Sequence, residues 1–484
     1  MAAPQIDSER LLGALGLAGA LLAGALLGMG QTGLFFLILL ALLTFSLLAF
    51  ALSKAAVHPE KVGFWILGLA VLAVPWSGIR ITGFASLADM LLVVALPFVA
   101  YSLITRRIRI RLPNWLIVGA ALLALSVILT ELAPKDLVVT AVPQDAGNFI
   151  YENTGGSNLQ MGARLMLALV VFPLFGVFLV RNWGQVSTLT TLWTAGVSIS
   201  CAVALADAFL GTGLQEMFGT SDLVEGAFGA QNYGHIGADV RYVGLAFHPV
   251  ALSLSVAMVI PVLVTRMNSR RGVAIYSPLL VLVLGASYLS GSRTGVVLLI
   301  ATIVLFLLLR PRSRKPILWI VAILLGIAFV ATWLDLSVLP ERFTTASISD
   351  SDTERWQRIN EGISNALARP FYGYGFEVSR HAHNTLLQLL SSGGFMALFG
   401  FLSVIFVYIR TGIRLESRIF DKSVGQDVVA CALALIIFLV AGTFSNAIFD
   451  RYIYVPALII MAAYALNQFE GNKQGKGKAG VRHQ

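Results

Sequence analysis

The feature that most constrains this chain is a succession of apolar blocks, each about 18–25 residues long, that runs through most of its 484 residues. About 20 apolar residues in a helix cross the roughly 30 Å hydrocarbon core of a bilayer. Such blocks must be helical because lipid cannot satisfy exposed backbone hydrogen-bonding groups. We therefore predict an all-α integral membrane protein that forms one polytopic membrane domain over 1–484.

Composition agrees with this fold class. The chain is 57% hydrophobic and 12% charged, whereas soluble domains carry about a quarter charged residues. The block Leu11–Leu27 lacks a convincing cleavage signature and is followed by many similar blocks, so we interpret it as the first span rather than as a signal peptide. We expect about 14 spans (12–14), at 11–28, 34–52, 63–79, 84–104, 114–132, 163–180, 187–210, 247–265, 274–290, 294–309, 317–334, 384–409, 428–446 and 453–468.

The placement of Lys and Arg predicts the orientation. With a cytoplasmic N-terminus, 23 of the 34 Lys and Arg residues fall in cytoplasmic connections or in the tail 470–484, as the positive-inside rule expects. The C-terminus is then also cytoplasmic, and the Gly/Lys-rich tail is predicted to be disordered. The net charge of +9 is explained by this distribution, so it does not indicate nucleic acid as a partner.

The other eleven cations fall outside, and ten of them are arginine. The positive-inside rule disfavours positive charge on this side, so the arginines retained there need another reason. The planar guanidinium group of arginine binds phosphate or carboxylate. The alternative is that several extend to the interface from helix ends or pair with nearby acids. The set is Arg80, Lys135, Arg164, Arg241, Arg293, Arg342, Arg355, Arg358, Arg369, Arg380 and Arg451.

Two predicted outer loops are long, 211–246 and 335–383. Long ordered loops usually carry function. Within the second, Thr353–Leu367 has apolar residues at helical spacing and charged residues on its other faces. We expect an amphipathic helix that lies on the membrane surface or covers a cavity.

Two short outer motifs carry an arginine. Gly291-Ser292-Arg293-Thr294-Gly295 forms a very short turn between two spans, and its small residues leave backbone N–H groups and Arg293 open to a ligand. Asp239-Val240-Arg241-Tyr242-Val243-Gly244 precedes the span at 247–265. A tight hairpin with an anchoring arginine, and a local Asp–Arg pair, are the structural alternatives.

A third motif, Pro370-Phe371-Tyr372-Gly373-Tyr374-Gly375-Phe376, is followed by Arg380-His381-Ala382-His383-Asn384. His383 would lie at the N-terminus of a membrane helix, where the helix dipole and nearby arginines disfavour imidazolium. A neutral imidazole there is a suitable general base. The alternative is a structural histidine at a helix cap.

These residues resemble the O-antigen ligase and polymerase (Wzy-type) superfamily. The resemblance is carried by Ser292–Gly295, Arg342-Phe343 through Trp356, Arg369–Gly375 and His383-Asn384, which is separated from Gly394 by nine residues. Ala397 stands where the family usually has a second glycine, a small departure because alanine also permits close packing. The similarity covers about 230–450, and the earlier spans only in general character.

The resemblance implies a GT-C-like, metal-independent membrane glycosyltransferase that acts on a polyprenyl-diphosphate-linked oligosaccharide donor. By resemblance, Arg241 and Arg293 hold the diphosphate and His383 activates the acceptor hydroxyl. Arg355, Arg380, His381, Asn384 and Asp89 are candidates for contacting the substrate or for supporting the residues that do. An aspartate in the position of Asp89 is more often a helix-boundary residue, and that is the alternative for it. The implied location is a bacterial inner membrane, with the site on the periplasmic face and membrane lipid around the protein.

The chemistry of these residue types agrees with that role. A diphosphate leaves as an anion and needs positive charge rather than a general acid, and no outer carboxylate pair suits a retaining glycosidase-like route. We expect neither a metal nor a cofactor: the first outer loop (28–33) has no carboxylate, and Cys201 and Cys431 lie in apolar blocks.

Other functions stay open. A transporter or flippase of lipid-linked saccharide would move substrate without forming a bond, and it usually has ionisable groups or broken helices near the midplane. A structural scaffold would leave the outer arginines unexplained. Within the family, a polymerase adds the glycan to another lipid-linked unit and a ligase adds it to lipid A–core or another acceptor. The span count and the long loop 335–383 favour a polymerase slightly.

Overall fold

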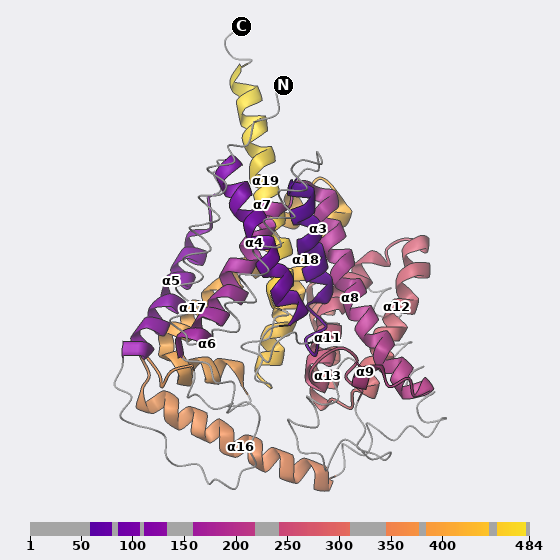
Figure 1. The fold of residues 1–484 in the computed structure, drawn as a ribbon, viewed down its shortest axis with the longest axis vertical. Helices are drawn as coiled ribbons and strands as arrows, with labels where there is room; N and C mark the ends of the chain where they lie inside the picture. Colours follow the sequence, from indigo (N-terminus) through magenta and orange to yellow (C-terminus); the bar gives the residue numbers. More distant parts are fainter. Residues whose placement is uncertain are drawn as a thin grey trace.

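The computed structural model describes residues 59–79, 86–106, 111–132, 158–217, 242–309, 345–376, 384–444 and 453–480, and the regular elements in this part of the chain are helices (Figure 1). They are α3 (Pro59–Ala73), α4 (Leu87–Arg106), α5 (Asn114–Leu132), α6 (Asn158–Met166), η1 (Leu167–Val171), α7 (Phe172–Leu179), α8 (Trp183–Leu210), α9 (Leu214–Met217), α11 (Pro249–Arg266), α12 (Arg270–Leu289), α13 (Arg293–Leu309), α16 (Thr345–Ala368), α17 (Thr385–Leu415), η2 (Glu416–Arg418), α18 (Lys422–Gly442) and α19 (Tyr454–Gly480).

Eight helical segments in the described residues are long and apolar enough to cross a membrane. They confirm the all-helical, multi-span prediction. The spans predicted at 11–28, 34–52 and 317–334 lie outside the described residues, as does most of the loop 211–246 and part of the loop 335–383. The loop helix predicted at 353–367 is confirmed within α16, where Trp356, Ile363 and Leu367 are exposed.

Several predicted ends were wrong by a few residues. The span predicted at 63–79 is a helix over Pro59–Ala73, because Pro75 disfavours helical conformation in the residue before it. The apolar run continues to Trp76, so hydropathy alone could not locate this end. The span predicted at 428–446 is α18, which begins at Lys422 because the Asp421 carboxylate accepts hydrogen bonds from the N–H groups of Ser423 and Val424.

Consecutive spans run in alternating directions, so the connections sort to two ends of the bundle (Figure 1). The site end carries the α12–α13 turn at 290–292, the segment 242–248 and α16. The basic end carries the C-termini of α4, α11 and α17 and the start of α12, with arginines that include Arg106, Arg266, Arg271 and Arg414. The predicted orientation depends on basic residues that fall in every second connection, and the arginines named here do lie together at one end of the bundle.

Helix α11 forms the centre of the bundle, in contact with α8, α12, α13 and α18. All of its residues except Val250 and Arg266 are buried. A helix that is apolar on every side is stable only inside a protein or a membrane. At its basic end, Arg266 Nη2 donates to Asp427 Oδ2 of α18 at 2.6 Å, and both side chains are almost fully buried. Paired burial of this kind leaves neither charge without a partner.

Small residues allow the spans to approach closely. A Cβ on Gly119 of α5 would lie 2.9 Å from the carbonyl oxygen of Gly400 in α17, and one on Gly400 would lie 2.9 Å from that of Gly119. Gly196 of α8 lies directly against the backbone of Leu72 in α3. Close backbone packing through small residues is a main source of helix association in lipid, where apolar burial alone gives little advantage.

Helix α17 is broken at Gly394, which has φ +67° and ψ −166°. The N–H of Phe395, which would otherwise bond to Ser391, donates instead to the carbonyl of Pro370 at 2.7 Å. The carbonyl of Ser391 then accepts from Tyr374 N–H at 2.9 Å, and that of Ser392 accepts from Gly375 N–H at 2.8 Å. The segment 370–376 thus replaces the helical hydrogen bonds that the break removes.

This arrangement predicts the effect of Gly394→Ala. The backbone conformation at Gly394 is one that residues with a Cβ almost never adopt, and the added Cβ would overlap the backbone of Phe371. We expect a loss of at least ~2 kcal/mol in the free energy of unfolding, measured by denaturant titration in mixed micelles. Gly285→Ala is the control because its nearest contact is 3.7 Å away and alanine favours helix. Equal stability of the two variants would contradict this account of the break.

Candidate functional site

At the site end, the turn between α12 and α13 lies on a cluster of buried hydroxyl groups. Ser290 and Ser253 share a hydrogen bond of 2.8 Å between their Oγ atoms, which joins the turn to α11. Ser292 caps α13: its Oγ accepts from the N–H of Gly295 at 3.2 Å. A Cβ on Gly295 would lie 2.7 Å from Ser253 Oγ, so the glycine is needed for this close packing. The very short turn predicted here is therefore confirmed.

Arg293 is the first residue of α13 and is partly buried. A cation at a helix N-terminus is disfavoured by the helix dipole, whereas an anion there is stabilised both by the dipole and by free N–H groups. An anionic group beside Arg293 would therefore be attracted by the guanidinium and by the helix end together. The arrangement is suited chemically to holding phosphate.

The segment that follows Arg241 is bound to the same turn. The N–H of Tyr242 donates to the carbonyl of Leu289, the last residue of α12, at 3.4 Å. The next two N–H groups, of Val243 and Gly244, both donate to Gln215 Oε1, at 2.6 and 2.9 Å. The hydrogen bonds to Leu289 and Gln215 therefore hold the beginning of this segment close to the α12–α13 turn.

Gln215 is in turn positioned by the end of α8. Its N–H donates to Asp207 Oδ2 at 2.8 Å, and Leu214 N–H donates to Asp207 Oδ1 at 2.8 Å. Burial, and then the negative charge of Asp207, raise the pKa of the Tyr242 phenol. Tyr242 is consequently a neutral hydrogen-bonding group at neutral pH. The sequence gave no signal for Gln215, because glutamine occurs on any polar surface.

The same end also holds Asp89. Its carboxylate accepts hydrogen bonds from the N–H of Ser86 at 2.9 Å and from Ser86 Oγ at 3.0 Å. These contacts fit the alternative reading of a helix-boundary aspartate at the start of α4. The neighbouring turn is joined to the Tyr242 segment, since Gly78 N–H donates to the carbonyl of Leu245 at 2.9 Å. A role for Asp89 in positioning an arginine stays a prediction.

The second part of the site end is the start of α17. Asn384 is its N-cap: Oδ1 accepts from Leu387 N–H at 3.0 Å, while Nδ2 donates to the carbonyl of Thr443 at the end of α18 at 3.3 Å. His383, the predicted base, precedes this cap directly in the sequence and lies outside the described residues, as do Arg241, Arg380 and His381. Arg355 lies on α16 and is half-buried.

The motif 370–376 connects the first half of α17 to α5 and α6. Phe376 N–H donates to Asn158 Oδ1 of α6 at 2.8 Å, and Asn158 Nδ2 donates to Thr130 Oγ1 of α5 at 3.0 Å. The guanidinium of Arg369 lies over the Tyr374 ring, 4.7 Å from its centre, an attractive cation–π geometry. Figure 1 shows α16 extending across the site end beneath both parts. The α12–α13 turn and the motif 370–376 thus belong to one end of the molecule.

In the part of the chain that the structure describes, no three His, Cys, Asp or Glu residues are grouped so that they could hold a metal ion. Cys201 and Cys431 are both buried and unbonded to each other. The residues described at the site end include arginine, serine, asparagine, glutamine and tyrosine, and the carboxylates of Asp207 and Asp89 accept hydrogen bonds from neighbouring groups of the chain. Such groups bind an anion or a sugar hydroxyl by hydrogen bonding and charge.

The fold and the site define a multi-pass helical membrane protein in which a partly buried arginine and buried serine hydroxyls lie together at one end. Residues 278–402 match a family model described as O-Antigen ligase. The chain thus carries an O-antigen ligase family domain over these residues, from α12 to the middle of α17, and this family consists of membrane enzymes of the glycosyltransferase type that serve polysaccharide biosynthesis. No curated protein matches the chain. The resemblance stated from the sequence is confirmed over this domain.

The contacts of Gln215 predict a local effect. Gln215→Met would leave the N–H groups of Val243 and Gly244 without their acceptor, and an unsatisfied buried N–H costs about 1–3 kcal/mol. Hydrogen exchange followed by mass spectrometry should show faster exchange over 242–245. Gln426→Met, at the basic end, is the control and should leave that segment unchanged. Wild-type exchange in the Gln215 variant would show that this side chain does not hold the segment.

Proposed function

We propose that this protein transfers or polymerises a polyprenyl-diphosphate-linked glycan, with no metal, at its site end. The observation that carries the proposal is that the O-antigen ligase domain at 278–402 includes Arg293 at the N-terminus of α13, on a turn to which the segment after Arg241 is bonded. Arg293 and Tyr242, the residue after Arg241, thus belong to chain segments that meet at the end of α12. This supports the assignment of a diphosphate site to Arg241 and Arg293.

The proposed reaction needs one base and a cationic site. His383 Nε2 or Nδ1 takes the proton from the acceptor hydroxyl, and the oxygen attacks the anomeric carbon of the donor glycan. The bond from that carbon to the diphosphate oxygen breaks, and polyprenyl diphosphate leaves as an anion stabilised by Arg241 and Arg293. Asn384 supports the role of His383 by capping α17, since this fixes the residue that follows the base. Arg355, Arg380 and His381 are proposed to contact the donor or acceptor.

The proposal includes the predicted orientation. With α3, α13 and α19 counted as spans beside the eight longer segments, and with spans at 11–28, 34–52 and 317–334 added, the chain crosses the membrane 14 times in a GT-C-like arrangement. Both termini are then cytoplasmic. The site end then faces the periplasm of a bacterial inner membrane. The amphipathic α16, with exposed Trp356 and Leu367, is proposed to lie at that membrane surface beside the lipid-linked donor. The partners are the lipid-linked donor and a glycan or lipid A–core acceptor.

A transporter or flippase of lipid-linked saccharide is the second candidate, favoured by the break in α17 at Gly394. Broken helices commonly form transporter binding sites because their free backbone groups bind substrate. Here the freed groups around Gly394 are bonded to the segment 370–376 instead, which supports a structural role for the break. Reconstitution separates the two functions, because only an enzyme forms a new glycosidic bond.

We expect His383→Ala to abolish glycan transfer in proteoliposomes supplied with lipid-linked oligosaccharide, while donor binding persists. Loss of a general base typically costs a factor of about 10²–10⁴. Arg293→Ala should chiefly weaken donor binding, and Arg293→Lys should restore it only in part because lysine lacks the bidentate fork. Product is measured on gels and donor affinity by titration.

Matched controls use residues of the same type elsewhere in the chain. His483→Ala lies in the C-terminal tail, and Arg271→Ala lies at the start of α12, the opposite end of that helix from the Arg293 turn. Both controls should keep wild-type transfer. Undiminished transfer by His383→Ala would remove the base assignment, and normal donor affinity in Arg293→Ala and in Arg241→Ala would remove the diphosphate site.

Deleting the gene separates polymerase from ligase, which share their chemistry at the donor. Loss of long glycan chains from every cell fraction is the result expected of a polymerase, which we favour slightly. Long chains that accumulate on the carrier lipid would instead identify a ligase. Surface glycans separated on a gel, with lipid-linked material extracted in parallel, provide the measurement.

A further inference from the structure

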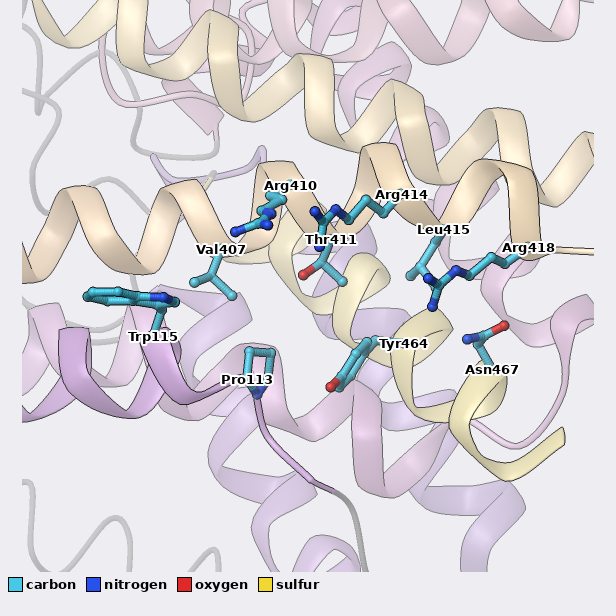
Figure 2. Close-up of a pocket in the computed structure, with 10 residues that line it drawn as sticks. All are labelled: Pro113, Trp115, Val407, Arg410, Thr411, Arg414, Leu415, Arg418, Tyr464 and Asn467. Carbon is cyan, nitrogen blue, oxygen red and sulfur yellow. The ribbon is translucent and has the colours of Figure 1, made fainter. Parts of the chain in front are cut away.

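A cavity lined by three arginines lies at the basic end, remote from the site described above. It has a volume of about 250 Å³ and is formed between the last turns of α17 with η2, the start of α5 and the middle of α19 (Figure 2). The side chains that matter for its chemistry are Arg410, Arg414, Arg418, Tyr464, Asn467 and Trp115.

Three arginines line one side of this cavity. Arg410, Arg414 and Arg418 are four residues apart and so follow one face of the helix, and Figure 2 shows all three along the wall that faces Tyr464 and Asn467. Like charges at this spacing repel one another. No carboxylate lines the cavity, and within the described part of the chain no hydrogen bond or ion pair is recorded for these guanidinium groups. The lining of the cavity is therefore strongly positive, and no acidic side chain in it balances the charge.

The opposite wall is held in place by backbone contacts. Tyr464 Oη donates to the carbonyl of Arg111 at 2.9 Å, and Gln468 Nε2 donates to the same carbonyl at 3.0 Å. The N–H of Arg111 donates back to Gln468 Oε1 at 3.3 Å. These bonds fix α19 against the start of α5, so the polar side chains of the wall are positioned before a ligand arrives.

An apolar groove of about 450 Å³ adjoins the basic cavity. It is lined by Leu402, Ser403, Phe406 and Ile409 of α17, by Leu439 of α18 and by Trp115, which both cavities share. On α17 the groove residues precede the arginines directly, so the groove extends from the basic cavity toward the membrane interior. Phe406 is 60% and Trp115 63% exposed. Tryptophan is enriched at this depth, between the head groups and the acyl chains.

We propose that this composite cavity binds an anionic phospholipid of the phosphatidylglycerol or cardiolipin class. The arginines hold the phosphate through bidentate hydrogen bonds, and one acyl chain lies in the groove. A free phosphate would leave the groove empty, and the ammonium of a zwitterionic head group would meet three cations. On the predicted orientation, this end faces the cytoplasmic leaflet, where basic cavities between spans bind such head groups.

Bound lipid would connect three helices, since the cavity is built from α5, α17 and α19. The same α17 begins at the capping residue Asn384 in the site end. The lipid is therefore a structural ligand that neutralises the arginine row and braces α17 against its neighbours.

The test compares Arg410→Gln/Arg414→Gln with Arg270→Gln/Arg271→Gln, which removes two exposed arginines at the same end but outside the cavity. Native mass spectrometry of the full-length protein measures binding of phosphatidylglycerol and of phosphatidylcholine with identical chains. We expect the wild type and the Arg270/Arg271 variant to prefer phosphatidylglycerol, and the Arg410/Arg414 variant to lose at least about tenfold in affinity for it.

Thermal unfolding supplies a second readout, because the difference in stability between the Arg410/Arg414 variant and the wild type should change sign when phosphatidylglycerol is added. In delipidated detergent, the Arg410/Arg414 variant should be at least as stable as the wild type because repulsion is relieved. With phosphatidylglycerol present it should be less stable. Equal binding of the two lipids, an equal loss in the Arg270/Arg271 variant, or full stabilisation by inorganic phosphate alone would each overturn the proposal.

Discussion

The break in α17 at Gly394 is the constraint on which the arrangement of the site end depends. A membrane-spanning helix cannot leave backbone groups unsatisfied in lipid, so the loop segment 370–376 must bond to Ser391, Ser392 and Phe395. That requirement fixes a loop motif to a span, and Phe376 extends the connection to Asn158 of α6. The first half of α17, which begins two residues after His383, is consequently held on more than one side.

Arginine has a different setting at each end of the bundle. At the site end, Arg293 begins α13 beside buried serine hydroxyls, at a helix end whose dipole favours negative charge. At the basic end, Arg410, Arg414 and Arg418 line a cavity beside an apolar groove, while Arg266 is neutralised by Asp427. The surroundings of each guanidinium group, rather than its presence, therefore indicate what it can bind.

Hydropathy and charge predicted the helical membrane fold, the α12–α13 turn and the helix in α16, because each depends on local composition. Helix ends were less predictable: Pro75 ends α3 inside an apolar run. The motif 370–376 was read from the sequence as a family feature, but its hydrogen bonds to the break in α17 depend on residues about 20 positions away. Gln215 gave no sequence signal, since its role comes from two backbone N–H groups distant in the chain. His383 and Arg241 stay predictions.

The central claim is that one polyprenyl diphosphate binds between Arg241 and Arg293 within reach of His383. An experimental structure of the protein in a lipid nanodisc with a non-hydrolysable lipid-linked saccharide tests it most directly. The account predicts phosphate oxygens within about 3 Å of both guanidinium groups, with the anomeric carbon facing His383. A diphosphate bound at the basic end, or arginine side chains dispersed around the rim without a shared cavity, would contradict it.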